Sequence, residues 1–374
     1  MSCYLLKNAV IWTEQSPTDI LIENSHIAKI SPNQSDNNAQ VIDLCGKTIF
    51  PGFFNAHVHF YGLNGPLPDE LLRRFVSGGV TTVRDMGMTF DAPYEEYQKW
   101  YEGRRDPEYP MIISAGKFIC NANTYGAVHP TGATIGHIVE ENPEAAREAV
   151  DKMVYSGAQL IKTGNDYGMD ASKPLDYLRE DVFKAIIQRA RELEVPSSAH
   201  ITKADKFVEA AKLGLTEAAH VPNNSMTDTQ VEEAASTGMA FTATMSVFDF
   251  AAVQFGENLM EDVTANVRRL YRAGMPMAVG TDFMRENPPY QTAGIPVHEF
   301  RLLAKAGLTI EEIVKAATID SARLCGVANQ TGSIEVGKLA DLVAISEPLD
   351  ETFHAFEAVP FVMHWGTLIK NEFD

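Results

Sequence analysis

The sequence has little of what a secreted, membrane-bound or nucleic-acid-binding protein would need. Only four of its 374 residues are cysteines, at the widely separated positions Cys3, Cys45, Cys120 and Cys325. Because there is no CxxC pair and no dense cysteine framework, we expect reduced thiols in a cytosolic protein. No apolar run reaches the length of a membrane-spanning helix, so no membrane span is expected. The first residues lack a basic start followed by a long apolar stretch, so no signal peptide is expected either.

Positive charge is also scarce. The chain has 31 Lys and Arg against 50 Asp and Glu, which gives a formal net charge of −19. Such a surface repels phosphate backbones and anionic lipids, so neither nucleic acid nor a membrane is expected as a partner. The hydrophobic fraction of 45% suits a globular core of this length. We therefore expect a cytoplasmic protein that acts on a small molecule, and self-association into a homo-oligomer stays open.

From residue 50 onward, short apolar segments alternate with amphipathic helical stretches about eight times. In the stretch 180–193, for example, Val182, Ile186 and Ala190 share one helical face. Strands are expected at 52–59, 80–84, 111–115, 158–162, 196–200, 216–220, 239–244 and 277–281. Eight such units predict an α/β fold of the (β/α)₈ TIM barrel type, whose active site lies at the carboxyl ends of the strands.

The two ends of the chain have β character instead. Short apolar runs fill residues 4–30 and a polar loop follows at 31–38, while 332–345 and 361–369 read as strand–turn segments. We expect these parts to pair into one small β-sandwich beside the barrel. The predicted division is 1–50 for the first part of the sandwich, 51–330 for the catalytic barrel and 331–374 for the second part.

Six residues with metal-binding side chains lie at the ends of expected strands. They are His57, His59, Lys162, His200, His220 and Asp282. Imidazole and carboxylate groups are ligands that zinc and similar divalent metals accept. Residues i and i+2 of a strand point to the same face, so His57 and His59 can hold one ion together. Because the strand ends meet at one mouth of a barrel, all six groups can converge there.

Each of these residues also has a purely structural interpretation. Lys162 could simply pair with a carboxylate, although a charged lysine inside a barrel is costly unless it is paired or modified. The more specific hypothesis is that the amine of Lys162 reacts with carbon dioxide to form a carbamate, an anion that can bridge two cations. His200 or His220 alone could be a core histidine, and Asp282 could cap the next helix. The equivalent positions of the two histidines at strand ends are better explained by metal binding.

Taken together, the motifs resemble the amidohydrolase superfamily, and within it the imidazolonepropionase-like and prolidase-like metal-dependent hydrolases. The resemblance extends from about residue 40 to the end of the chain. The matching segments are 51–60 (PGFFNAHVHF), 79–87 (GVTTVRDMG), 161–164, 199–200, 219–220, 280–282, 308–323 and 332–343. The set is specific for the superfamily and less specific for any subgroup.

The resemblance implies a binuclear centre with two divalent ions, for which zinc is the preferred metal. His57, His59 and Asp282 would hold the more buried ion. His200 and His220 would hold the more exposed ion.

The resemblance also implies how the two ions are linked and used. A carbamate on Lys162 and a hydroxide would bridge the ions. Two cations lower the pKa of the bridging water, so hydroxide exists at neutral pH. Asp282 would be the catalytic residue that accepts the hydroxide proton and passes it to the leaving nitrogen.

The segment 120–137 departs from the family pattern. Many prolidase-like members have a loop rich in glycine and histidine after the third strand, whereas this chain has CNANTYGAVHPTGATIGH. Tyr125, His129 and His137 could contact a substrate carboxylate or carbonyl there. Arg285, in the loop after Asp282, could pair with an anionic substrate. For Tyr125, His129 and His137 taken singly, a polar surface loop is an equally good interpretation. For Arg285, an ordinary arginine of a surface loop is the more common case.

The favoured function is a binuclear metal hydrolase that cleaves an amide-type C–N bond by attack of the metal-bridging hydroxide. The expected substrate is a dipeptide, an N-acyl amino acid or a related amide. Alternatives are a cyclic amide, an ester, a lactone or a carbamate as substrate, or a mononuclear deaminase, whose relatives usually lack the bridging lysine. A non-catalytic barrel scaffold is the remaining alternative. A content of two, one or no ions per chain would separate these hypotheses.

Overall fold

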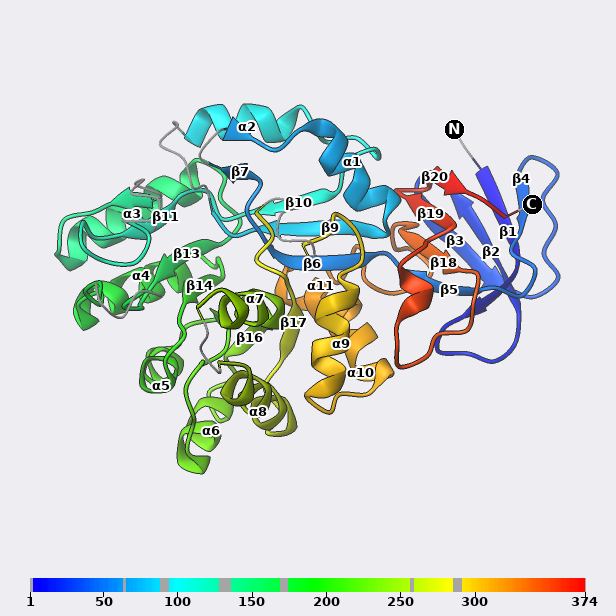
Figure 1. Ribbon diagram of the computed structural model, residues 1–374. Helices are drawn as coiled ribbons and strands as arrows, with labels where there is room; N and C mark the ends of the chain where they lie inside the picture. Colours follow the sequence, from blue (N-terminus) through cyan, green and yellow to red (C-terminus); the bar gives the residue numbers. More distant parts are fainter. Residues whose placement is uncertain are drawn as a thin grey trace.

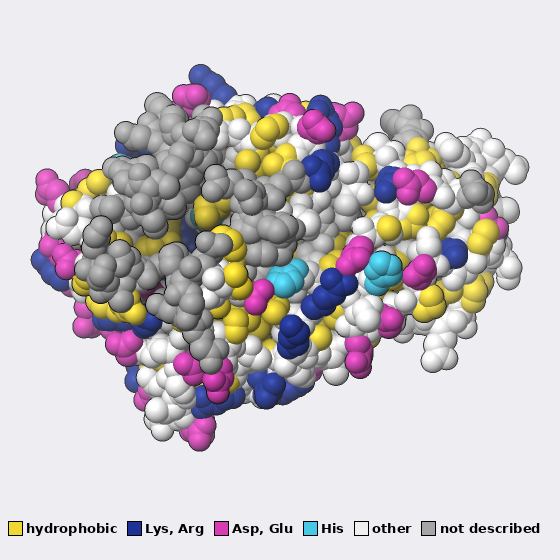
Figure 2. Space-filling model, in the orientation of Figure 1, with side chains coloured by type: hydrophobic (Ala, Val, Ile, Leu, Met, Phe, Trp, Pro, Cys, Tyr) yellow, Lys and Arg dark blue, Asp and Glu magenta, His cyan; other side chains and the backbone are white. Residues whose placement is uncertain are grey.

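The computed structural model describes residues 3–62, 65–87, 94–127, 136–168, 174–255, 259–284 and 291–373. A large body of parallel strands and surrounding helices lies beside a smaller sheet that contains both chain ends (Figure 1). This is the predicted α/β class, of the TIM-barrel type with an extra sheet domain. On the face shown in Figure 2, acidic side chains are spread over the helices, in keeping with the net charge of −19.

Two parallel sheets form the centre of the large body. Their strand orders are β10-β9-β6 and β12-β11-β13-β14-β15-β16-β17. The strands are β6 (Phe53–Val58), β9 (Val80–Asp85), β10 (Met111–Ser114), β11 (Phe118–Cys120), β12 (Gly136–Ile138), β13 (Ile161–Gly164), β14 (Ser197–His200), β15 (Glu217–Ala219), β16 (Ala240–Ala243) and β17 (Met277–Val279). Most positions in these strands are buried, because helices cover the outer faces of the sheets.

Backbone hydrogen bonds join the two sheets at two places. Beyond β17, the Phe283 nitrogen donates to the His57 oxygen at 3.3 Å, and the His59 nitrogen donates to the Phe283 oxygen at 2.7 Å. At the other junction, the Gln159 nitrogen donates to the Ser114 oxygen at 2.8 Å. The first junction brings the end of β6 against the segment that follows β17.

Helices follow the strands and pack on them through apolar faces. The helix after β13, for example, buries Val182, Phe183 and Ile186 against the core. The helices are α1 (Asp69–Ser77), α2 (Tyr94–Glu102), α3 (Pro143–Tyr155), α4 (Glu180–Glu192), α5 (Ala204–Leu213), α6 (Asp228–Ala235), α7 (Met245–Phe255), α8 (Leu259–Arg272), α9 (Val297–Lys305), α10 (Ile310–Lys315), the π-helix η1 (Ala316–Asp320), α11 (Ser321–Leu324) and the 3₁₀-helix η2 (His354–Phe356). No helix in the described ranges combines the length and apolar character needed to span a lipid bilayer.

The smaller sheet joins the two ends of the chain, as predicted. Its order is β20-β19-β18-β5-β1-β2-β3, with β4 also paired to β1. Its strands are β1 (Cys3–Ile11), β2 (Thr18–Glu23), β3 (His26–Ser31), β4 (Gln40–Asp43), β5 (Thr48–Pro51), β18 (Leu342–Ile345), β19 (Phe361–His364) and β20 (Thr367–Asn371), while β7 (Tyr61–Gly62) and β8 (Gly65–Pro66) form a separate hairpin.

The predicted β-sandwich appears as one continuous eight-stranded sheet. Strand β1 makes the sheet continuous. Its first part pairs with β4, and its last two residues, Val10 and Ile11, pair with β5. The pairing of β1 with β2 is irregular between Leu6 and Ala9, where Asn8 has φ +53°. Apolar side chains from both chain ends enclose a common core. The division of the chain at residues 50 and 330 stays a prediction.

Two strand predictions are wrong in detail. The third strand ends at Ser114 and resumes as β11, because Gly116 adopts φ +68°, and the short strand β12 was not predicted. The strand expected at 158–162 begins only at Ile161. Gly157 has φ +97° and, with Ala158, still closes the end of α3 through backbone hydrogen bonds. Lys162 is therefore the second residue of β13 rather than its last.

Candidate metal centre

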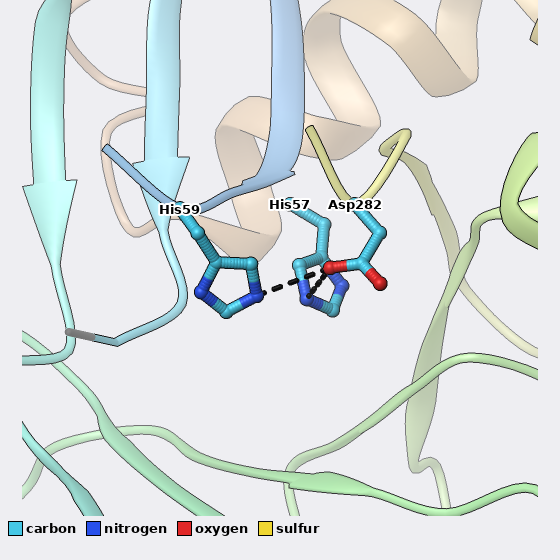
Figure 3. Close-up of side chains that lie close together, drawn as sticks. All are labelled: His57, His59 and Asp282. Atoms are coloured by element: carbon cyan, nitrogen blue, oxygen red, sulfur yellow. Dashed lines mark ion pairs between the residues drawn. The ribbon is translucent and has the colours of Figure 1, made fainter. Parts of the chain in front are cut away.

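Three of the predicted ligands converge on one point. Nε2 of His57 lies 3.2 Å from Oδ1 of Asp282, and Nε2 of His59 lies 3.1 Å from the same oxygen. Figure 3 shows both imidazole rings directed at this carboxylate, with the histidines coming from β6 and the aspartate from the segment after β17. The ligand atoms of the three side chains lie within 4.8 Å of one another, a spacing that suits a shared cation.

Asn55 and Gly280 bring the two segments together. The Asn55 amide donates to Oγ1 of Thr281 at 2.8 Å, and its oxygen accepts from the Thr281 nitrogen at 3.2 Å. The same oxygen accepts from the His57 nitrogen at 3.3 Å. A Cβ atom on Gly280 would lie 2.6 Å from the Cβ of His57, so only glycine allows this approach.

The other two predicted histidines lie in the same cluster. The ring centroid of His220 is 4.8 Å from that of His57 and 4.5 Å from that of His200. His200 is the last residue of β14, and His220 follows β15 directly. The four histidines, at or directly after the carboxyl ends of β6, β14 and β15, therefore meet in one cluster, although β6 belongs to the other sheet.

Lys162 is buried close to this cluster. Its side chain is 1% exposed, and its Nζ has no hydrogen-bond partner among the described residues. Burial, opposed in part by the carboxylates of Glu217 and Asp282, lowers the pKa of Lys162 to about 7. A large fraction of the amine is then neutral at pH 7, which is the form that can act as a nucleophile.

Hydrogen bonds at Nδ1 orient two of the imidazole rings, those of His59 and His220. Nδ1 of His59 lies 2.9 Å from the carbonyl oxygen of Gly87, so this nitrogen carries the proton and donates it. Nδ1 of His220 lies 2.7 Å from Oγ1 of Thr244. In both rings the opposite nitrogen, Nε2, is left for the centre of the cluster, the arrangement typical of metal-binding histidines.

In the absence of a metal ion, the electrostatics favour a neutral imidazole at three of the four histidines and an ionised carboxylate at Asp282. Burial holds the pKa of His57 and of His220 well below the usual range and lowers the pKa of His200 to about 4. For His59, burial lowers the pKa, but the hydrogen bond and charge of Asp282 outweigh it and raise the value. Burial opposes ionisation of Asp282 too, yet the surrounding imidazoles together hold its pKa well below the usual range. Neutral imidazole and ionised carboxylate are the forms that bind metals.

Two of these residues have an uncommon backbone conformation. Asp282 has φ +55° and His220 has φ +107°, although neither is a glycine. Such conformations cost free energy and persist where the surrounding structure enforces them, often at functional sites. Their coincidence in one cluster supports a functional role for the cluster.

A buried ion pair lies beside the candidate centre, inside the strand layer. Nη2 of Arg84 lies 2.6 Å from Oε1 of Glu217, and both side chains are about 2% exposed. Arg84 also donates to the Ala56 carbonyl at 2.8 Å and to Oγ1 of Thr242 at 3.0 Å, while Thr242 donates to Glu217. This network leaves both charges hydrogen-bonded, which a buried pair requires.

Of the predicted substrate contacts, Tyr125 lies at the site. Its ring stacks on His200 with centroids 3.7 Å apart and an angle of 8° between the planes. His137 lies half-buried in β12, at the edge of the seven-stranded sheet and opposite Ile119. His129 and Arg285 lie outside the described residues.

The sequence patterns did not single out Asn55 or Thr244, which hold ligands in place. Asn55 lies two residues before His57, so strand alternation places both on the same face and could have identified it. Thr244 lies immediately after β16 and carries no comparable signal in the sequence. Asp166 was also missed, and it accepts hydrogen bonds from the nitrogen and Oγ1 of Thr202, both at 2.7 Å.

Comparison with models of protein families identifies the family of this chain. A model of the amidohydrolase family matches residues 48–360, which is most of the chain. The chain belongs to the amidohydrolase family.

This amidohydrolase is similar to several imidazolonepropionases. It is 26% identical over 285 residues to that of Alkaliphilus oremlandii (strain OhILAs), which covers 74% of this chain and 60% of that protein. It is 28% identical over 412 residues to that of Brevibacillus brevis (strain 47), and this match covers 98% of this chain and 90% of that protein. A shorter match, 36% over 96 residues, is to a dihydroorotase of Bacillus cytotoxicus, covering 24% and 22%. The alignments thus span less than two thirds of the Alkaliphilus and Bacillus proteins.

Solved structures share the overall fold of this amidohydrolase. A prolidase complexed with N-methylphosphonate-L-proline has a TM-score of 0.83 at 24% identity, covering 99% of this chain and 100% of the other. A Xaa-Pro dipeptidase with bound methionine in the active site has a TM-score of 0.82 at 21% identity, covering 98% and 99%. The ochratoxinase of A. niger has a TM-score of 0.81 at 18% identity, covering 99% and 96%. These likenesses show the fold alone.

Proposed function

We propose that this amidohydrolase is a metal-dependent hydrolase that cleaves an amide-type C–N bond of a small substrate. The observation that carries the proposal is the convergence of His57, His59 and Asp282 within 4.8 Å, beside two further histidines and a buried lysine. The proposed centre holds two divalent ions, preferably zinc. One is bound by His57, His59 and Asp282, and the other by His200 and His220.

The buried polar atoms of the site suit bound cations. Nδ1 of His57, Nε2 of His200 and Nζ of Lys162 are all buried without a hydrogen-bond partner among the described residues. An unsatisfied buried polar atom costs about 1–3 kcal/mol, so three in one place call for an explanation. Nε2 of His200 can bind a metal directly. A carbamate on Lys162 would convert an amine that lacks a hydrogen-bond partner into an anionic ligand.

We propose that Lys162 carries this carbamate. Its burial and its lack of a hydrogen-bond partner mean that a protonated ammonium would be poorly stabilised in this position. The neutral amine can add carbon dioxide and lose a proton, which gives an anion with two oxygens. One such group can bind two cations at once and so can complete both halves of the centre.

The chemistry follows from the positions of the ligands. Divalent ions bound here would lower the pKa of a water held between them and would polarise a substrate carbonyl. Asp282 faces the point where the histidines converge, so its carboxylate can accept a proton from the attacking water and deliver it to the departing nitrogen. Tyr125 covers His200 and limits how a substrate approaches this side.

A linear amide, such as a dipeptide or an N-acyl amino acid, is the preferred substrate class. It is supported by the overall similarity to structures of a prolidase and of a Xaa-Pro dipeptidase. The second candidate is a cyclic amide, because the relatives found by sequence are imidazolonepropionases and a dihydroorotase. Lys162 favours two ions over one and does not separate the two substrate classes.

A hydrolysis screen tests the proposal. Metal-replete protein is incubated with a dipeptide set, N-acyl amino acids, cyclic ureides and lactones, and product amines or acids are quantified. We expect turnover of a linear amide that disappears on chelation and falls by at least about 10²-fold in Asp282→Asn. Turnover confined to cyclic ureides would favour the second candidate. Amide hydrolysis that persists after complete removal of metal would contradict the proposed function.

A further inference from the structure

A serine lies beside Lys162 in the strand layer. Strands β13 and β14 are parallel neighbours (Figure 1), and in their register Lys162 pairs with Ser198. Paired residues of adjacent strands point to the same face of a sheet, and their backbones are about 5 Å apart. The side chain of Ser198 therefore lies on the same face as the Lys162 amine.

Neither of these two side chains makes a hydrogen bond. Ser198 and Lys162 are each about 1% exposed. Oγ of Ser198, like Nζ of Lys162, is buried without a partner in the part of the chain that the structure describes. A buried hydroxyl without a hydrogen bond costs free energy that an alanine at the same position would not cost. The serine is therefore best explained by a group that it can bind.

The neighbours on either side of this pair do not supply such a group. Strand β11 flanks β13 on its other edge, and there Nζ of Lys162 lies 5.9 Å from the ring centroid of Phe118, which has no polar atom. Beyond Ser198, the register of β14 and β15 places Glu217, whose carboxylate accepts a hydrogen bond from Arg84 at 2.6 Å. Ser198 is thus the hydroxyl that the strand register places next to the lysine amine.

We propose that Ser198 is a positioning residue whose hydroxyl donates a hydrogen bond to a carbamate oxygen on Lys162. The inference rests on the proposed function, in which Lys162 carries that carbamate. When the carbamate forms, the neutral amine makes an N–C bond to carbon dioxide and releases one proton to solvent, so one negative charge is shared by two oxygens. Each oxygen has more than one lone pair, so it can accept from Ser198 and still bind a cation. A hydrogen bond to an anion is stronger than one between neutral groups, so Ser198 stabilises the carbamate relative to the free amine.

The test measures the carbamate itself. Zinc-replete protein is equilibrated with increasing concentrations of isotope-labelled bicarbonate, carbon NMR gives the fraction of chains that carry the carbamate, and elemental analysis gives the ions per chain. Ser198→Ala should need at least about tenfold more bicarbonate for half occupancy, the factor that corresponds to one charge-assisted hydrogen bond. At low bicarbonate it should also lose one ion. Saturating bicarbonate should restore the carbamate and the ion, which it would not do if the substitution had only damaged the structure.

Ser197→Ala is the matched control. Ser197 is the preceding residue and is equally buried, but strand alternation directs it to the other face, where its hydroxyl lies 3.5 Å from Oγ1 of Thr216. This variant should leave the bicarbonate requirement unchanged. Ser198→Thr and Ser198→Val form a second comparison, because their side chains have nearly the same shape and the first alone keeps a hydroxyl. The valine variant should need at least about tenfold more bicarbonate than the threonine variant.

The outcomes separate this proposal from the proposed function. If Ser198→Ala has the wild-type bicarbonate requirement, or if Ser197→Ala raises the requirement equally, Ser198 does not position the carbamate and the proposal is overturned, while the hydrolase proposal stands. If the wild-type protein shows no carbamate signal at any bicarbonate concentration, this proposal and the carbamate on Lys162 are overturned together. The hydrolysis screen decides separately whether the chain cleaves amides.

Discussion

Lys162 differs from a surface lysine in both burial and hydrogen bonding. Its side chain is almost fully buried, its amine has no hydrogen-bond partner among the described residues, and burial lowers its pKa to about 7. A structural lysine would be expected to pair with a carboxylate at hydrogen-bond distance. Glu217, whose charge acts on Lys162, is instead paired with Arg84 at 2.6 Å. This arrangement supports a modified Lys162.

Lys162→Ala should therefore lose one of the two metal ions and most of the activity. A short carboxylic acid such as propionate should restore part of both, because it can occupy the space of the missing carbamate. Elemental analysis and turnover, with and without propionate, measure this. Lys315→Ala, which removes an exposed lysine of α10, is the control. A variant that keeps both ions without added acid would show that Lys162 is not a ligand.

Asp282→Asn should keep the fold and lower kcat by at least about 10²-fold, the scale expected for a lost general acid–base. Asparagine keeps the shape and one oxygen, but its amide cannot accept the proton of the attacking water. Because it also binds metal more weakly, the metal content of the variant must be measured beside its kcat. If fully metallated Asp282→Asn turns over substrate at the wild-type rate, Asp282 is only a structural ligand.

At the scale of elements, the link between β6 and the end of β17 positions the ligands. Asn55→Ala removes the side chain that bonds Thr281 and the His57 nitrogen, and leaves buried donors unsatisfied. The free energy of unfolding should fall by about 1–3 kcal/mol, and metal affinity should fall as well. Urea unfolding and metal titration measure the two effects, with the exposed Asn38→Ala as control. If the variant is destabilised but its metal affinity is unchanged, Asn55 contributes to stability and not to metal binding.

Helix α9 is linked to α7 by a buried carboxylate. Glu299 accepts hydrogen bonds from the nitrogens of Met245 and Ser246, both at 2.7 Å, at the start of α7. Burial raises the pKa of Glu299 to about 7, against the effect of these hydrogen bonds. Because α7 begins next to Thr244, which bonds His220, this link also supports the candidate centre.

The raised pKa predicts a pH dependence of stability. Between pH 4.5 and about 7 the unfolded chain has released the Glu299 proton while the folded protein keeps it, so stability falls as pH rises. The loss is on the order of 3 kcal/mol for the full shift. Glu299→Gln cannot ionise, so its unfolding free energy relative to wild type should rise across this window. Urea unfolding from pH 4.5 to 8 measures it, with the exposed Glu351→Gln as control. A difference that is flat with pH would contradict the raised pKa.

At the scale of the whole molecule, the sequence predicted the main architecture because it rests on local patterns. Apolar segments and amphipathic helices alternate clearly enough to indicate the α/β class and the pairing of both chain ends. Residues at strand ends were identified for the same reason, and His57, His59, His200 and His220 do meet in one cluster.

What the sequence did not predict depends on three-dimensional neighbours. The break after Ser114 follows from the φ of +68° at Gly116, and the strand β12 follows from its pairing with β11; no local pattern reveals either. Thr244 matters only because the fold places its hydroxyl against His220. The buried pair of Arg84 and Glu217 joins residues 133 positions apart, so neither shows its partner in the sequence.

The metal content of the whole chain tests the central claim most directly. Metal-replete protein is analysed for its elements, and anomalous diffraction places the ions. The proposal predicts two ions per chain, one between His57, His59 and Asp282 and the other at His200 and His220, with extra density on Nζ of Lys162. One ion or none in metal-replete protein, or an unmodified Lys162 beside two ions, would contradict the proposed binuclear centre.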